Sequence, residues 1–222
     1  MYELPKAIIG KVMAMIQVIN SVMRRVPAWP LYIVLVVPGI WLFYQAVNNQ
    51  LGADPLKALE FQLGLYALQL LIASLLITPL RNLLGLNLIK FRRSIGLMAF
   101  FYVLAHLLTY LWLDQQWWWG AIIKDLTKRP YIIIGMLSFL ALVPLAVTSN
   151  NASIKRLGAL SWKKLHRLAY FAAIGGAVHY VLLRKTWEQE PILYVLGVLA
   201  LLGYRAAKAN KGRLGNFPYF RL

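Results

Sequence analysis

Residues 95–113 read IGLMAFFYVLAHLLTYLWL, an apolar run that contains one histidine and no charged side chain. A helix needs about 20 mainly apolar residues to cross the hydrocarbon core of a bilayer. Backbone groups inside lipid must bond within their own segment, so a run of this kind forms a helix. Strict alternation of apolar and polar residues, which marks the strand of a membrane barrel, is missing. The run therefore predicts a transmembrane helix with His106 in its interior.

Five further runs of similar character flank this one, so we expect an all-α bundle of six transmembrane helices. The composition agrees, because 60% of the 222 residues are hydrophobic and 14% are charged. An ordinary soluble domain has about 45–50% apolar and about 25% charged residues. These values exclude a soluble globular domain and a disordered chain. The six expected spans are Leu31–Val47, Leu63–Leu80, Ile95–Leu113, Tyr131–Ser149, Leu165–Leu183 and Pro191–Ala207.

The net charge is +17, from 24 basic and 7 acidic residues. In a soluble protein this excess would suggest nucleic acid, but here the basic residues lie between apolar runs, as they do in membrane proteins. They concentrate before the first run, in the second and fourth connections and after the sixth run, whereas every acidic residue except Glu3 lies in the other connections. We therefore expect cytoplasmic termini, contacts to membrane lipid and no nucleic-acid partner; in a bacterium, this topology corresponds to the inner membrane, with the other connections in the periplasm.

Three parts are expected along the chain: an N-terminal extension over 1–26, the helical bundle over 27–207 and a basic cytoplasmic tail over 208–222. In the extension, small or polar residues interrupt Ala7–Val22 at every third or fourth position. This spacing indicates an amphipathic helix that lies on the membrane surface. A signal peptide is the competing interpretation, although no small-x-small cleavage site follows.

All three histidines fall inside expected spans, where an ionisable residue is by default a functional-site hypothesis. The third and fifth spans run in the same direction, which places His106 and His179 in their outer halves. His166 lies at the inner end of the fifth span, about 20 Å from His179 at 1.5 Å per residue. Arg92 lies at the inner end of the third span, about 21 Å from His106. Two parallel helices therefore offer candidate ligands at two matching depths.

Imidazoles that face each other from two helices are typical axial ligands of haem iron. We expect His106 and His179 to hold one haem, and His166 to lie at an inner site that faces Arg92 or no protein ligand. Aromatic rings should keep the site dry, and small residues should let a flat ring approach the backbone. The residues expected in these two roles are Phe100, Phe101, Tyr102, Tyr170 and Phe171, and Gly175, Gly176 and Ala177.

Other interpretations stay open. A single histidine in a span often serves as a hydrogen-bonding link between helices. A zinc site needs three or four ligands, and the chain has no cysteine and no carboxylate within the expected spans. On an ideal helix, the thirteen-residue spacing makes the side chains of His166 and His179 point in directions about 140° apart around the axis. A tilt of the helix, a π-bulge or two haems on different flanks could accommodate this difference. The guanidinium of Arg92 has no free lone pair, which favours a membrane-edge anchor or a haem-propionate partner over an iron ligand.

The chain resembles the MsrQ (YedZ) family, the haem-binding membrane subunits of bacterial periplasmic methionine-sulfoxide reductase systems, within the ferric-reductase-like superfamily. The resemblance covers roughly residues 27–205, and its motifs occur in the family's order and spacing. These motifs are Leu51-Gly52-Ala53-Asp54-Pro55, Ile77-Thr78-Pro79-Leu80, Arg92-Arg93-Ser94-Ile95-Gly96-Leu97, His106 with Tyr110, Lys128-Arg129-Pro130-Tyr131, Trp162, Leu165-His166-Arg167 and His179-Tyr180.

The resemblance implies a b-type cytochrome subunit with one or two haems. His106, His166 and His179 match three of the superfamily's four haem-ligating histidines, and Arg92 takes the fourth position, as the subfamily does. The implied partner is a periplasmic molybdopterin enzyme that reduces methionine sulfoxide in oxidised proteins. The implied electron donor is a quinol or a cytosolic flavin reductase, with FMN or quinone as a further cofactor. The chain lacks a Gly-x-Gly-x-x-Gly loop for NAD(P)H.

Two alternative functions come from other classes of protein. One is a metalloreductase that delivers electrons to ferric chelates outside the cytoplasm. The other is a non-redox membrane protein, a small transporter or structural protein, in which the histidines are structural.

Overall fold

The computed structural model describes residues 6–184 and 188–214, and every regular element within these ranges is a helix. The all-helical fold is therefore confirmed. The α-helices are α1 Lys6–Arg25, α2 Pro30–Val47, α3 Pro55–Leu83, α4 Arg92–Leu108, α5 Trp119–Lys128, α6 Pro130–Val147, α7 Asn151–Leu157, α8 Ala159–Leu165, α9 Leu168–Leu183 and α10 Gln189–Leu214. A 3-10 turn, η1 Ile89–Phe91, precedes α4, and a π-helical segment, η2 Thr109–Asp114, continues it.

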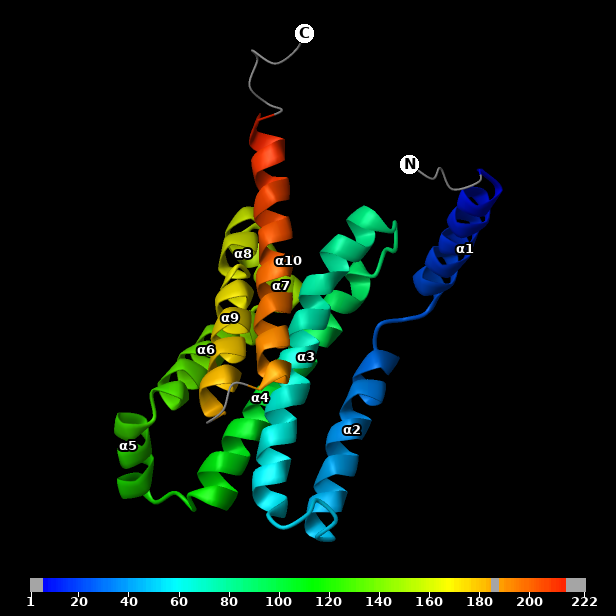
Figure 1. Ribbon diagram of the computed structural model, residues 1–222. Helices are drawn as coiled ribbons and strands as arrows, with labels where there is room; N and C mark the ends of the chain where they lie inside the picture. Colours follow the sequence, from blue (N-terminus) through cyan, green and yellow to red (C-terminus); the bar gives the residue numbers. More distant parts are fainter. Residues whose placement is uncertain (1–5, 185–187, 215–222) are drawn as a thin grey trace.

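The long helices run alternately up and down the bundle (Figure 1). Proline at the first helical position starts three of them, α2 at Pro30, α3 at Pro55 and α6 at Pro130. The fixed φ of proline suits a first turn, where its missing N–H costs no bond. At α3, the Asp54 carboxylate also accepts a hydrogen bond from the Lys57 N–H at 3.0 Å. Local sequence therefore determines where these helices begin.

Within the described residues, five helices are long and apolar enough to cross a membrane: α2, α3, α4 with η1 and η2, α6 and α10. Each corresponds to one of the expected spans. The remaining expected span, Leu165–Leu183, which is the fifth along the chain, begins later than predicted, because the chain turns at His166 and Arg167 before α9 starts at Leu168. With 16 residues, α9 is about 24 Å long, which is less than the roughly 30 Å of a hydrocarbon core. The six-span count stays a prediction.

Two helix pairs, α3 with α4 and α6 with α9, form the centre of the bundle, and α10 packs against α9. Their contact is close because small residues lie between them. Ala99 of α4 and Ala172 of α9 are fully buried in one cluster with Leu71 and Leu142. A Cβ at Gly175 of α9 would overlap the Ser138 hydroxyl of α6. Small residues of this kind let helix backbones approach each other inside a membrane.

The α2 helix lies at the edge of the bundle, and its outer face is apolar. Ile33, Val34 and Ile40 are all more than half exposed, as side chains that face lipid would be. One polar link fixes the helix to α4: the Tyr102 hydroxyl donates to the Leu35 carbonyl at 2.7 Å and accepts from the Gly39 N–H at 2.9 Å.

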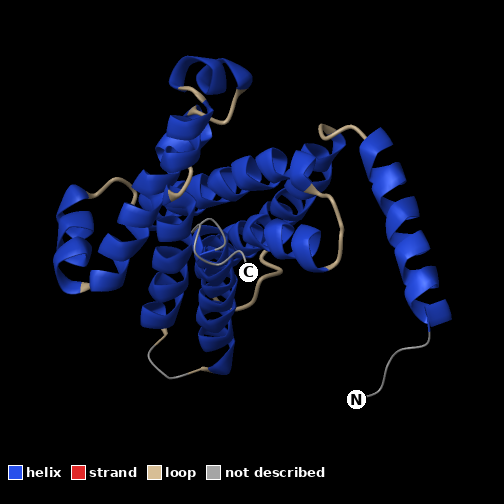
Figure 2. Cartoon of the chain, turned by 90° about the horizontal axis from the view of Figure 1, so that it is seen from above, coloured by secondary structure: helices blue, strands red, loops and turns tan. Residues whose placement is uncertain are grey.

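The N-terminal α1 helix stands apart from the bundle (Figure 2). The Asn20 amide donates to the Gly85 carbonyl at 2.8 Å, and its oxygen accepts from the Asn87 N–H at 2.8 Å. These bonds fix α1 to the connection between α3 and α4. The segment is helical, as its spacing indicates, and its place on a membrane surface stays a prediction.

Enlarging Gly175 should loosen the contact between α6 and α9. We expect Gly175→Leu to lower the free energy of unfolding by about 1–3 kcal/mol, the usual cost of an overpacked core. The unfolding temperature of the detergent-solubilised protein should fall accordingly. Gly203→Leu on α10 is the matched control, because nothing lies within 4 Å of a Cβ at that position. Equal unfolding temperatures for the two variants would contradict the tight α6–α9 contact.

Candidate functional site

His106 extends from α4 towards α3 and is held there by a backbone carbonyl. Its Nδ1 lies 2.7 Å from the Glu60 carbonyl oxygen, which can only accept a hydrogen bond. Nδ1 therefore carries the proton, and Nε2 keeps its lone pair. One turn further along α3, Gly64 makes room for the ring, since a Cβ there would lie 3.1 Å from Nδ1.

His179 repeats this arrangement between α9 and α6. Its Nδ1 lies 2.7 Å from the Tyr131 carbonyl oxygen, so the proton is again on Nδ1. Gly135 lies one turn beyond Tyr131, and a Cβ there would come within 2.9 Å of Nδ1. In both cases the Nδ1 hydrogen bond leaves Nε2 available as a ligand, which is the usual arrangement of a metal-binding histidine.

The two rings lie close to each other between the two central helix pairs. Their centroids are 6.2 Å apart, and their planes meet at 82°. With metal–nitrogen bonds of about 2 Å, and about 1 Å from each ring centre to its nitrogen, two axial imidazoles on one metal have centroids roughly 6 Å apart. The separation therefore fits a single metal ion held between His106 and His179.

Two protein ligands do not complete a zinc site. Within the described residues, no group of three or more His, Cys, Asp or Glu side chains could hold a metal ion. A metal held by two opposed imidazoles needs its other ligands from elsewhere, and a porphyrin supplies four in one plane. The donor set of His106 and His179 thus fits haem and does not fit the three- or four-ligand sites of zinc.

A cavity of about 560 Å³ surrounds both rings and lies between α3, α4, α6 and α9. Its volume falls in the range of about 300–1,000 Å³ that is usual for small-molecule and cofactor sites. Glycines and aromatic rings form much of its wall. Those that line it are Gly64, Gly135 and Gly176, and Phe61, Phe139, Tyr110, Tyr131 and Tyr180.

The sequence-based prediction that five aromatic residues surround the site is wrong, because none of these residues lines the cavity. They are Phe100, Phe101, Tyr102, Tyr170 and Phe171. Phe101 and Phe171 point away from the bundle and are 51% exposed, and Tyr102 bonds to α2. Phe100 does not line the cavity but stacks on Phe139, which does, with ring centroids 5.9 Å apart. Of the three small residues predicted beside the ring, Gly176 alone lines the cavity, whereas Gly175 packs against α6 and Ala177 against a separate cluster.

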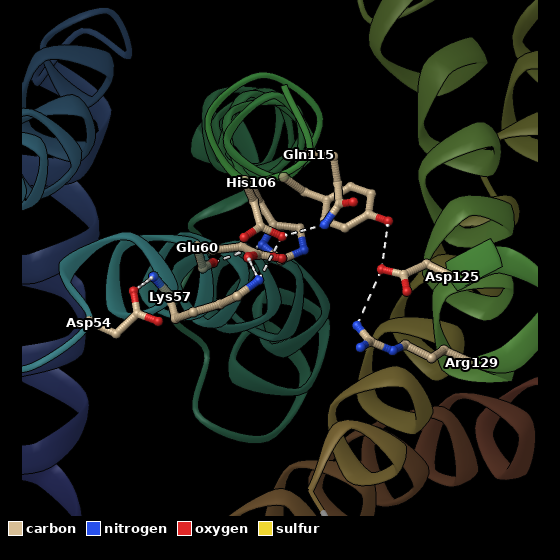
Figure 3. A network of polar contacts seen from close by, with 9 residues as sticks. Asp54, Lys57, Glu60, His106, Gln115, Asp125 and Arg129 are labelled. Carbon is tan, nitrogen blue, oxygen red and sulfur yellow. Dashed lines mark hydrogen bonds and ion pairs between the residues drawn. The ribbon is translucent and has the colours of Figure 1, made fainter. Parts of the chain in front are cut away.

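Charged side chains gather at one end of the cavity, near the connections that carry the acidic residues (Figure 3). The Lys57 ammonium bridges Glu60 at 3.2 Å and Asp114 at 2.7 Å. Arg129 pairs with Asp125 at 3.2 Å, and the same carboxylate oxygen accepts from the Tyr110 hydroxyl at 3.2 Å.

A second arginine, Arg184, lies over the Phe61 ring and pairs with Glu188 at 3.3 Å. The cavity thus suits a flat apolar ligand with a charged edge.

His166 does not belong to this cavity. It lies in the turn between α8 and α9, where it stacks on Trp162 with centroids 3.7 Å apart. Its Nε2 lies 3.1 Å from the Thr148 hydroxyl, which donates its own proton to the Pro144 carbonyl. Because the helix is interrupted at this turn, the angle of about 140° that an ideal helix would set between the side chains of His166 and His179 does not apply.

Arg92 lies at the first turn of α4 and donates to the Thr78 hydroxyl at 2.7 Å. A second arginine, Arg205 of α10, donates to the Leu75 carbonyl at 2.7 Å and to the Tyr170 hydroxyl at 3.1 Å. The Nε atoms of both arginines are buried without a hydrogen-bond partner. Arg92 and Arg205 therefore lie close together, since Thr78 and Leu75 are on successive turns of α3. The described acidic residues of α3, η2 and α10 lie at the opposite ends of the same helices.

Comparison with known proteins agrees with this architecture. Residues 61–177 match the family described as the ferric reductase like transmembrane component. Proteins from Brucella ovis, Brucella suis and Brucella melitensis are 50% identical over 180 residues, which is 81% of this chain and 81% of each relative. All three carry the name "Protein-methionine-sulfoxide reductase heme-binding subunit MsrQ". The chain belongs to the MsrQ family.

The resemblance seen in the sequence motifs is therefore confirmed. The matched ferric-reductase segment contains Gly64, His106, Gly135 and His166 and ends at residue 177, shortly before His179. No solved structure matches this MsrQ-family chain.

Sequence reasoning missed Gly64 and Gly135, although both are visible in the sequence as glycines within expected spans. A glycine in an apolar run is also common at ordinary helix contacts. What distinguishes these two is the imidazole from a neighbouring helix, and that pairing depends on how the helices are rotated.

Proposed function

We propose that this MsrQ-family chain is a b-type haem subunit that carries electrons across the bacterial inner membrane to a methionine-sulfoxide reductase. The observation that carries the proposal is the pair of facing imidazoles, His106 and His179, in an apolar cavity at the centre of the bundle. The names of the Brucella relatives support both the haem and the reductase system.

His106 and His179 would hold the haem iron through their Nε2 atoms. Bound haem would supply a one-electron carrier, and the chain's residues tune it. The Nδ1–H bonds to the Glu60 and Tyr131 carbonyls make each imidazole a stronger electron donor to the metal. Phe61 and Phe139 line the cavity and would limit the access of water, so that the charge of the metal is poorly screened and the potential responds to nearby residues.

The charged end of the cavity would orient the haem. The two propionate groups are carboxylates, and Arg129 and Arg184 are cations that line the cavity near its mouth. Each arginine pairs with one carboxylate and has further N–H groups for a second. The propionate edge would therefore face the outer side of the membrane, where an external acceptor can collect the electron.

The distribution of charge supports six spans with both termini in the cytoplasm and with loops one, three and five in the periplasm. In this topology α9 crosses as the fifth span. Its short length is tolerable because it packs between α6 and α10, and because a bilayer can thin locally around a short helix.

The partner that fits this topology is a periplasmic molybdopterin enzyme that reduces methionine sulfoxide. Electrons would enter from a quinol or from a cytosolic flavin reductase, with FMN or quinone as the further cofactor. The many basic residues at the cytoplasmic end, among them Arg93, Lys163 and Lys164, would attract the phosphate of a flavin.

At the inner end, we propose that Arg92 binds an anionic group of a cofactor and does not ligate iron. Arg92 and Arg205 are close cations with buried, unpartnered Nε atoms. Charges of one sign in a partly buried place are costly unless an anion compensates them. A propionate of a second haem, with His166 as its histidine ligand, or the phosphate of a flavin would supply that anion.

Replacing either central histidine should remove the outer haem. We expect His106→Ala and His179→Ala to lose it, as measured by the haem-to-protein ratio and the reduced absorption spectrum of purified protein. His166→Ala is the comparison variant: because His166 lies outside the cavity, it should keep the outer haem and its spectrum, and any loss of haem should be confined to the proposed inner site. Full haem content and reducibility in His106→Ala would contradict the pairing, and a wild-type protein without a Soret band, even with haem supplied, would favour a non-redox function.

Removing the Arg92 charge should make a cofactor at the inner end harder to reduce. A positive charge nearby stabilises the reduced form, so we expect Arg92→Ala to lower one midpoint potential in a redox titration. Arg25→Ala is the control, since Arg25 is exposed at the end of α1, apart from the bundle. A titration identical to that of the wild type would make Arg92 a structural anchor.

Deleting the gene distinguishes the reductase subunit from a metalloreductase. We expect the deletion strain to accumulate methionine sulfoxide in periplasmic proteins while its iron uptake stays normal. Impaired reduction of ferric chelates with intact sulfoxide repair would support the metalloreductase instead.

A further inference from the structure

We propose that Gly64 and Gly135, together with the carbonyls of Glu60 and Tyr131, are positioning residues that hold the two imidazoles of the central pair perpendicular to each other. This inference rests on the proposed haem site.

The two halves of the site are built in the same way. On α3, Gly64 follows Glu60 by four residues, and on α6, Gly135 follows Tyr131 by four residues. Four residues are about one helical turn, so the glycine lies beside the carbonyl on the same face of the helix. Each ring therefore lies over a glycine while its Nδ1–H reaches the carbonyl of the preceding turn.

This fit leaves no room for a side chain. A Cβ at Gly64 would lie 3.1 Å from Nδ1 and 3.3 Å from Cε1 of His106. At Gly135 the corresponding distances to His179 are 2.9 Å and 3.1 Å. Such separations are below ordinary van der Waals contact, so an added methyl group would push the ring and stretch its hydrogen bond. By contrast, nothing lies within 4 Å of a Cβ at Gly96 or Gly197.

The hydrogen bond and the glycine act on the same ring from one side and together restrict its rotation. The plane of the His106 ring is thus set by the direction of α3, and the plane of the His179 ring by the direction of α6. The result is the interplanar angle of 82°. Cofactor binding would preserve this angle, because it uses Nε2 and leaves both Nδ1 contacts in place.

The relative orientation of two axial imidazoles has a direct spectroscopic consequence. In low-spin ferric haem, parallel rings split the iron d orbitals that bond to them and give a rhombic electron paramagnetic resonance spectrum with three resolved features. Perpendicular rings leave those orbitals nearly equal in energy and give a single large-g signal at low field. We therefore expect the large-g signal from the His106–His179 site.

The test is the low-temperature spectrum of the oxidised full-length protein, recorded for the wild type, Gly64→Ala and Gly135→Ala. Each spectrum is repeated in the His166→Ala background to remove any signal from an inner haem. We expect the wild type to show the large-g signal and each alanine variant to shift towards a rhombic spectrum. Gly96→Ala and Gly197→Ala are the matched controls and should leave the signal unchanged.

Three results separate the possibilities. A rhombic wild-type spectrum with full haem content would overturn the inference while leaving the haem site in place. An unchanged large-g signal in both Gly64→Ala and Gly135→Ala would also overturn the inference and leave the haem site in place. A folded alanine variant that loses haem, beside a control that keeps it, supports the positioning role. Absence of haem from the wild type would instead contradict the proposed function itself.

Discussion

The hydrogen bond from an imidazole Nδ1–H to a backbone carbonyl of the neighbouring helix is the interaction on which the site depends. It occurs twice, from His106 to Glu60 and from His179 to Tyr131, at 2.7 Å in both cases. Each bond fixes the proton on Nδ1, leaves Nε2 free to bind a metal, and links two central helices. The α3–α4 and α6–α9 pairs are therefore also the two halves of the proposed haem site.

The two ends of the bundle carry different charge arrangements, which is consistent with the two different anionic groups proposed to bind there. Near the outer end, the cations that line the cavity are paired with carboxylates, as Lys57 is with Asp114. At the other end, which we propose to be the inner one, Arg92 and Arg205 lie close together, and the interactions resolved for Arg92 include no acidic residue. An anionic cofactor would neutralise the inner pair, whereas the outer network would orient a ligand whose charged edge faces the partner reductase.

The all-helical fold and the closeness of His106 and His179 could be predicted from the sequence, because hydropathy marks the helices and a rise of 1.5 Å per residue gives the two histidines similar positions along them. Rotation about the helix axes could not be predicted. Rotation decides that Phe139 faces the cavity while Phe101 faces outward, and that Gly64 and Gly135 lie against imidazoles. The turn at His166 also escaped prediction, since no proline or glycine marks it between Leu165 and Leu168.

A cryo-electron microscopy map of the purified protein with its cofactors tests the central claim most directly, because it locates the metal. The account predicts porphyrin density between α3, α4, α6 and α9, with the Nε2 atoms of His106 and His179 each about 2 Å from one iron. Rings that point into lipid, or that lie too far apart to share one iron, would contradict it.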